Sequence, residues 1–159
     1  MPKGTAVEKR LLQLAGEYAV AAQMALHGWH ASITVGNFPE VDLVAYNPKT
    51  KKHLTVQVKS GRGQWGFGNV KWDEREEFCA RLAKQVDVFV LVDMPKNAEG
   101  AESKMRFFVI PAKKLAEIAR RNIEGWKEEW KQNPQPLWLS REETRDFQDR
   151  WDLLDEVAR

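Results

Sequence analysis

The sequence predicts an α/β domain in which a mixed central β-sheet is flanked by helices. Its length of 159 residues suits one domain with a sizeable hydrophobic core. The patterns along the chain follow the order helix, three strands, helix, strand, strand, helix and helix. Residues 86–92 form a nearly continuous apolar run, which is typical of a strand buried on both faces. A sheet built from such strands needs helices to cover it.

The N-terminal half is expected to form a helix followed by a three-strand meander. The helix should cover residues 6–27, because apolar side chains recur there at helical spacing and Gly28 then ends the pattern. The strands are expected over residues 29–35, 40–46 and 53–59, with turns at 36–39 and 47–50. The second turn contains Asn47 and Pro48, which favour a tight reversal, so the last two strands should run antiparallel.

The second half continues with two strands between helices. Residues 61–69 contain four glycines and predict a loop or a bulged hairpin. Helices are expected over 73–85, from Pro111 to about 131, and from Ser140 onward, with strands over 86–92 and 105–110. Ser140 and Glu143 have the spacing of a capping box. We therefore expect an α/β core over residues 1–132, and a helical extension over 133–159 that packs on the same domain.

Composition and charge narrow the function. No apolar run reaches the length of a membrane span, and the N-terminus has no apolar signal core, so a cytoplasmic protein without a membrane partner is expected. The single Cys79 excludes an internal disulfide and fits a reducing compartment. Net charge is only +2, but residues 43–72 hold six lysines and arginines and no acid, whereas residues 140–159 are net negative. The basic block suits a phosphate-bearing polymer, although a solvated lysine-rich loop would have the same composition.

The hairpin over residues 40–59 carries the polar residues that suggest a site. Side chains two apart on a strand share a face, so Gln57 and Lys59 point the same way. A turn centred between residues 49 and 50 would pair Asp42 with Gln57 and Glu40 with Lys59, with an uncertainty of a residue or two. A carboxylate, an amide oxygen and an ammonium at one end of a hairpin can hold a hard divalent cation beside a positive charge. Asp42 is the preferred acid and Glu40 its rival.

Three short motifs then resemble the PD-(D/E)xK nuclease superfamily, which has the restriction-endonuclease-like fold. They are Gly16-Glu17, Glu40-Val41-Asp42-Leu43 and Gln57-Val58-Lys59-Ser60. The resemblance covers residues 7–111, a range that contains the two later strands as well as the three motifs. It does not cover the C-terminal third. It implies a mixed central sheet flanked by helices and an enzyme that cleaves phosphodiester bonds with Mg²⁺ or Mn²⁺.

The resemblance also implies a role for each matched residue. Asp42 and Glu17 would bind the metal, together with the Gln57 side chain and the Val58 carbonyl group. Lys59 would orient the attacking water or offset charge on the phosphate. Gln57 departs from the motif because it stands where an Asp or Glu is usual, and its neutral amide binds a cation more weakly.

Residues beside the hairpin are candidates for contacts with nucleic acid. We expect phosphate contacts from Lys51, Lys52, Arg62 and Lys71. Trp65, or Phe67, could stack on an unpaired base, but an aromatic-packed loop covering the sheet edge explains these residues equally well.

The sequence thus favours a metal-dependent endonuclease acting on DNA. A homodimer would fit, because cutting both strands requires two sites. The alternatives are a non-catalytic nucleic-acid-binding module with the same fold and a protein-interaction domain that uses the tryptophan-rich C-terminal third. Each of these residues also has an interpretation without a function. Glu17 could be an ordinary helix acid paired with a lysine, and Asp42 could face water at the entry to its strand. Lys59 could be a solvated lysine near the sheet edge.

Overall fold

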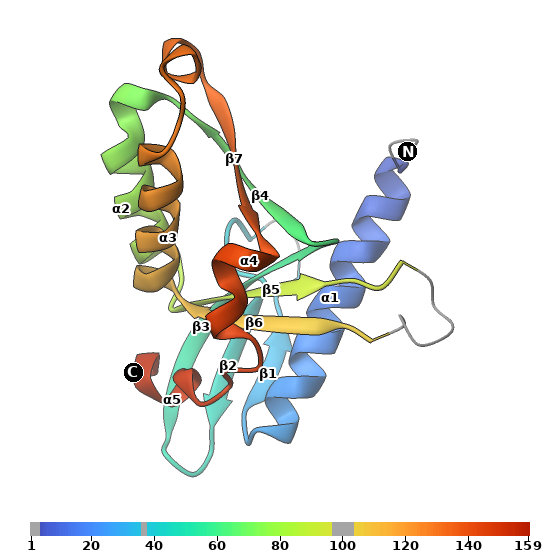
Figure 1. Ribbon diagram of the computed structural model, residues 1–159. Coiled ribbons are helices and arrows are strands. Elements are labelled where there is room, and N and C mark those ends of the chain that lie inside the picture. Colours follow the sequence, from blue (N-terminus) through green and yellow to red (C-terminus); the bar gives the residue numbers. More distant parts are fainter. Residues whose placement is uncertain (1–3, 36–37, 97–103) are drawn as a thin grey trace.

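The computed structural model describes residues 4–35, 38–96 and 104–159, and Figure 1 shows its arrangement. The helices are α1 (Ala6–Leu26), α2 (Arg75–Gln85), α3 (Ala112–Glu124), α4 (Arg141–Thr144) and α5 (Leu153–Val157), with short 3₁₀ turns η1 (Trp72–Glu74), η2 (Glu128–Gln132) and η3 (Arg145–Phe147). The strands are β1 (His30–Ile33), β2 (Leu43–Asn47), β3 (Lys52–Gly61), β4 (Gln64–Val70), β5 (Val88–Asp93), β6 (Arg106–Pro111) and β7 (Gln135–Ser140).

The main sheet is mixed, with the strand order β1-β2-β3-β5-β6. Only β3 and β5 run parallel, and the other neighbours are antiparallel. Leu43 pairs with Val56 and Tyr46 with His53, which is the register expected for the hairpin. The expected pairing of Glu40 with Lys59 is wrong, because Glu40 lies in a turn with φ of 70° and β2 begins only at Leu43.

Helices cover both faces of this sheet, as the apolar run over 86–92 indicated (Figure 1). Val88 and Val90 pack against α1 on one face, in a core that includes Val20 and Met24. Phe89 and the residues that alternate with these valines pack against α2 and α3 on the other face. All six residues of β5 are buried, so the buried-strand prediction is confirmed.

A second, two-stranded sheet of β4 and β7 forms an arm that extends from the main sheet beside α2 and α3 (Figure 1). The glycine-rich segment, expected as a loop or a bulged hairpin, contains the strand β4, which pairs with the distant β7 and has a register shift between Gly66 and Asn69. Strand β7 was not among the expected strands, and its buried residues Leu137 and Leu139 alternate with exposed neighbours.

The C-terminal third is less helical than expected. Helix α3 ends at Glu124, before the expected end near residue 131. The capping box of Ser140 and Glu143 is present, but it caps only the four residues of α4. The division of the chain at residue 132 stays a prediction. None of the helices in the described ranges has both the length and the apolar character that crossing a membrane requires.

Candidate active site

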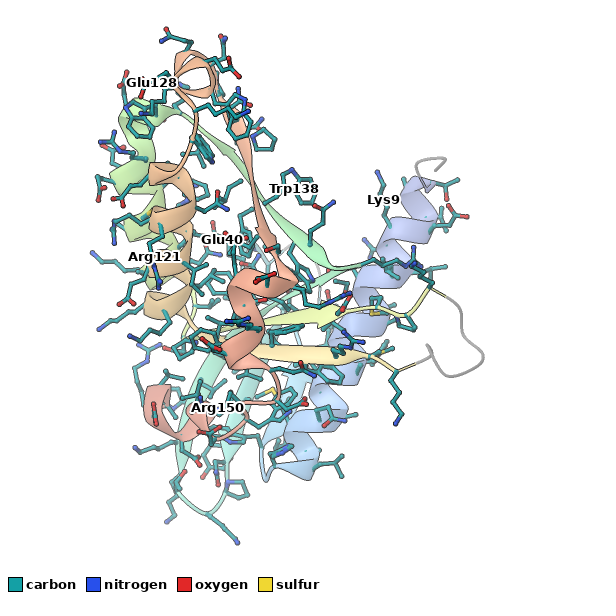
Figure 2. All side chains as sticks on the ribbon, in the orientation of Figure 1. Lys9, Glu40, Arg121, Glu128, Trp138 and Arg150 are labelled. Atoms are coloured by element: carbon teal, nitrogen blue, oxygen red, sulfur yellow. The ribbon has the colours of Figure 1, made fainter. Side chains whose placement is uncertain are left out.

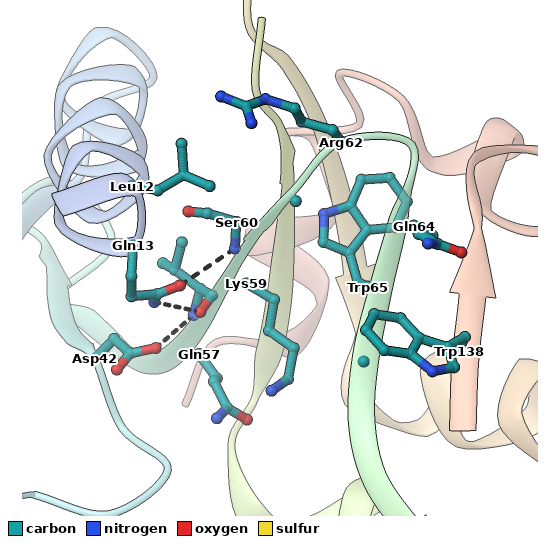
Figure 3. Close-up of a pocket in the computed structure, with 13 residues that line it drawn as sticks. Leu12, Gln13, Asp42, Gln57, Lys59, Ser60, Arg62, Gln64, Trp65 and Trp138 are labelled. Atoms are coloured by element: carbon teal, nitrogen blue, oxygen red, sulfur yellow. Dashed lines mark hydrogen bonds between the residues drawn. The ribbon is translucent and has the colours of Figure 1, made fainter. Parts of the chain in front are cut away.

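A pocket of about 680 Å³ opens where the C-terminal half of β3 passes between α1 and the arm (Figure 3). Asp42, Gln57 and Lys59 all line it, together with Gln13 of α1 and Trp138 of β7. The acid that precedes β2 and the lysine of β3 therefore reach the same space, as the hairpin argument required.

Asp42 is tied to β3 by both its backbone and its side chain. Its N–H donates to the Val56 carbonyl at 2.9 Å, and its Oδ2 accepts the Val58 N–H at 2.7 Å. Burial raises the pKa of the Asp42 carboxyl above its ordinary value, while the Val58 N–H and the Lys59 ammonium oppose that rise. Asp42 is thus a partly desolvated anion held at the pocket, and it does not simply face water at the strand entry.

Lys59 carries its charge into the same partly dry environment. Its Nζ lies 5.1 Å from the centroid of the Phe67 ring, within the range of a cation–π interaction. Burial lowers the pKa of Lys59, and the Asp42 carboxylate acts in the opposite direction. Because this side chain is partly buried beside an acid, the interpretation of Lys59 as an ordinary solvated lysine is wrong.

Glu17 faces Asp42 across an adjoining hollow, which both residues line with Gln13. Burial raises the pKa of the Glu17 carboxyl, and the Asp42 charge raises it further, while a hydrogen bond from Gln13 and the charge of Arg10 lower it. Its hydrogen-bond partner is an amide, and not the lysine of the interpretation without a function.

Gln13 connects the parts of this site, and the sequence analysis missed it. Its Nε2 donates to the Val58 carbonyl oxygen at 2.7 Å and its Oε1 accepts the Ser60 N–H at 3.2 Å (Figure 3). The same Nε2 also donates to Glu17 Oε1 at 3.1 Å. One signal was available, because Gln13 lies four residues before Glu17 and so shares its face of the helix.

Gly16 allows α1 to approach β3 closely enough for these contacts. A Cβ at this position would lie 2.0 Å from the Ser60 Oγ and 3.6 Å from the Val58 side chain. A larger residue would have to displace the Ser60 hydroxyl or move the helix away from the strand. The Gly16-Glu17 motif therefore has a steric part and a chemical part.

Gln57 lines the pocket, but its side chain is already engaged. Its Oε1 accepts a hydrogen bond from Nε2 of Gln85, the last residue of α2. Binding a cation through this oxygen would require Gln57 to release Gln85.

The donor groups here nevertheless fit a hard divalent cation. The Asp42 charge disfavours the charged form of Glu17, and the Gln13 amide donates hydrogen bonds to two of the expected ligand oxygens. The described part of the chain contains no cluster of three or more His, Cys, Asp and Glu residues that could hold a metal. A cation bound here would therefore take the rest of its ligands from carbonyl, amide and water oxygens, which Mg²⁺ accepts.

Comparisons with known proteins identify the fold. Neither a protein-family model nor a curated protein sequence matches the chain. Its structure is similar to that of a bacterial homing endonuclease, I-Ssp6803I, with a TM-score of 0.55, 15% identity, and coverage of 96% of this chain and 95% of the other. The chain has the restriction-endonuclease-like fold. A Holliday junction resolvase from Archaeoglobus fulgidus, Hjc, aligns over 84% of this chain and 87% of its own, with a TM-score of 0.45 and 13% identity.

Within this restriction-endonuclease-like fold, Trp65 is a core residue. Its ring is 1% exposed, its Nε1 donates to the Val92 carbonyl at 3.1 Å, and it packs edge-on against Phe108. Phe67 is buried as well. The expectation that Trp65 stacks on a base is wrong in this conformation, and the alternative of an aromatic-packed segment over the sheet is the one that holds.

The four cations expected at phosphates lie in different places. Arg62 lines the pocket. Lys51 and Lys52 lie at the β2–β3 turn, and with about 3.3 Å per strand residue, Lys52 is about 23 Å from Lys59. Lys71 is exposed and forms an ion pair with Glu74 at 3.4 Å. Of these side chains, only Arg62 lines the pocket that holds Asp42.

Proposed function

We propose that this protein is a metal-dependent endonuclease that hydrolyses phosphodiester bonds in DNA, with Mg²⁺ or Mn²⁺ as its cofactor. The observation that carries the proposal is the position of Asp42, which lines one pocket with Lys59 and an adjoining hollow with Glu17. The fold shared with a homing endonuclease supports it.

Each residue has a chemical task in this proposal. Asp42, Glu17 and the Val58 carbonyl would hold the cation, with Gln57 as a weaker neutral ligand. When bound, the cation polarises the phosphate and lowers the pKa of a water molecule. Lys59 would stabilise negative charge at the phosphate, and its partial burial strengthens that interaction because less water screens it.

One observation favours a second candidate, a nucleic-acid-binding module without catalysis. Gln57 brings no negative charge, and its oxygen is occupied by Gln85. Such a module would bind DNA through its cations, and replacing Asp42 would leave binding unchanged. A protein-interaction domain, the remaining alternative, would show no affinity for DNA.

Cleavage of supercoiled plasmid tests the proposal directly. The wild type should nick DNA with Mg²⁺ or Mn²⁺ and not with EDTA. Asp42→Asn keeps an acceptor for the Val58 N–H, and Lys59→Met keeps the aliphatic stem beside Phe67, so both variants should fold. Each should lose about 100-fold or more in rate, the usual effect of removing a group that acts on the reacting atoms.

Lys52→Met is the matched control, because it removes a lysine from the same strand about 23 Å away. It should cleave at nearly the wild-type rate. Equal cleavage by the wild type, Asp42→Asn and Lys59→Met would overturn the proposed mechanism. Sedimentation of the protein with and without DNA would test the expected homodimer.

A further inference from the structure

Trp138 is an aromatic side chain at the pocket with one supported side and one open side. It lies on the outward face of β7 and is 49% exposed. Its cross-strand partner is Gly66, where a Cβ would lie 3.1 Å from two atoms of the six-membered ring. The absence of a side chain at Gly66 therefore lets the indole rest on the neighbouring strand. Figure 2 shows the side chain projecting from the arm toward the side on which α1 lies.

The position of Trp138 links it to the proposed phosphate site. The ring lines the same pocket as Asp42 and Lys59, with Arg62 at the same pocket and Leu12 and Gln13 of α1 across from it (Figure 3). Lys9 lies one turn earlier on α1, on the side that faces the arm (Figure 2). Positive groups thus flank a space that an aromatic ring closes on one side.

The arm itself suits a polyanion. Strands β4 and β7, over 64–70 and 135–140, contain no Asp or Glu. Trp138 also forms a wall of a second hollow of about 490 Å³, which includes the half-exposed Trp130. A strand leaving the Lys59 pocket along this face would meet aromatic surface without repulsion from the arm.

We propose that Trp138 stacks on an unpaired base next to the phosphate held at Lys59, so that the preferred substrate is DNA with unpaired nucleotides at the cleavage site. This inference rests on the proposed function for the position of the phosphate. Stacking on an aromatic ring tolerates any base, because every base has a π-face. In a continuous duplex both faces of a base are covered by its neighbours, whereas a gap, bulge or flap leaves a face free for the indole.

The test uses two DNA probes that differ only at one position. Both are duplexes carrying 2-aminopurine, which lies in a short single-stranded gap in one probe and is fully paired in the other. Binding is measured with Ca²⁺ in place of Mg²⁺ and again with EDTA, so that affinity is followed without turnover. The wild type should bind the gapped probe about tenfold more tightly, which corresponds to about 1.4 kcal/mol, and should quench its fluorescence.

Trp138→Ala should lose the tenfold preference and the quenching, with little change in affinity for the paired probe. Trp138→Phe should keep most of both, because it retains an aromatic face. Tyr46→Ala is the control, since Tyr46 is a half-exposed aromatic residue near the opposite end of the hairpin. Thermal unfolding of each variant verifies that the fold is intact.

The inference is overturned if Trp138→Ala binds both probes like the wild type. It is also overturned if the variant loses the same factor of affinity for the gapped probe and for the paired probe. It is also overturned if the variant changes the oligomeric state in light scattering, because the ring would then belong to an interface between copies. Plasmid cleavage separates this test from the proposed function. If the protein cleaves plasmid but does not bind the gapped probe more tightly than the paired one, the role of Trp138 is rejected and the proposed function is not. If the preference for the gapped probe and the quenching both depend on Trp138 but the protein cleaves no DNA with any of the metals, the role of Trp138 is supported and the nuclease proposal is rejected.

Discussion

The environments of Asp42 and Glu17 disfavour their charged forms. Both carboxyls lose hydration in the fold, and the Asp42 charge disfavours ionisation of Glu17. Residues chosen for stability would have their pKa lowered by partners. Shifts in the opposite direction, at two acids that line one hollow, are typical of functional sites. The pH dependence of stability should report this arrangement.

The prediction concerns the free energy of unfolding in EDTA. Because the pKa of Asp42 is raised in the folded state, the folded protein holds this proton more tightly than the unfolded chain. The contribution of Asp42 to stability should therefore fall as pH rises from about 4, near the unfolded value, through the raised folded value. Asp42→Asn should be the more stable protein at pH 7, and the difference should disappear at low pH.

Urea unfolding between pH 3 and pH 8 measures this difference. Asp73→Asn serves as the control, because Asp73 is an exposed carboxyl away from the pocket. A difference between wild type and Asp42→Asn that does not depend on pH would contradict the prediction.

The sequence revealed the charged members of the site but not the residues that complete it. Asp42 and Lys59 stand out because charges border apolar strands, and Glu17 because it lies near an apolar helix stripe. Gln13 and Trp138 give no such contrast. The role of Trp138 depends on the pairing of β4 with β7, whose residues are far apart in the chain. The same pairing buries Trp65, which local composition presented as the exposed aromatic.

At the scale of elements, the docking of α1 on β3 determines the site. Gln13 forms its hydrogen bonds with β3 where Gly16 lets the helix lie against Ser60. The Ser60 hydroxyl is buried and has no hydrogen-bond partner among the described residues. The contact between Gly16 and Ser60 is therefore closely packed.

Gly16→Ala tests this contact. Alanine favours a helix over glycine by about 1 kcal/mol, so an open position would be stabilised. Here the new Cβ would overlap the Ser60 Oγ, and we expect a net loss of about 1–3 kcal/mol in the free energy of unfolding, as for other overpacked contacts. Denaturant unfolding measures it.

The double variant Gly16→Ala/Ser60→Ala removes the overlapping hydroxyl and should recover most of the loss. A stabilised single variant would show that helix and strand lie farther apart than described.

Local patterns predict the elements of this fold best where pairing is local. The β2–β3 register follows from a four-residue turn, and it is correct over the whole of β2. The strand β7 was not expected because Pro134 and Pro136 disfavour a regular element there, and because its partner β4 is distant in sequence. Alternation of buried Leu137 and Leu139 with Pro136 and Trp138 was the available signal, but it is short.

At the scale of the whole molecule, the lysines and arginines near the pocket lie apart from those at the β2–β3 turn. Lys59 and Arg62 line the pocket between α1 and the arm and Lys9 lies on the side of α1 that faces the arm, whereas Lys51 and Lys52 lie at the far turn of the hairpin. A DNA strand held at the pocket would contact the first group. The net charge of +2 hides this division.

The salt dependence of DNA binding distinguishes the two groups. About three phosphate contacts predict that log K falls with log salt at a slope near −2.7 for a duplex. Arg62→Gln should reduce the magnitude of the slope by about 0.9, while Lys52→Gln should leave it unchanged. Fluorescence anisotropy at several salt concentrations gives the slopes. A larger effect of Lys52→Gln would place the phosphate-binding face at the hairpin turn, as the sequence alone suggested.

The hydrogen bonds of Gln13 have a consequence for how the protein would respond to the divalent cation proposed above. The amide nitrogen already satisfies Glu17 and the Val58 carbonyl, so an arriving ion competes with a group built into the protein. Part of the ion's binding free energy is spent on releasing that side chain. Occupancy should therefore follow the free concentration of the ion in the surrounding solution, and the resting protein would keep its reactive centre closed by a neutral amide until the ion is abundant.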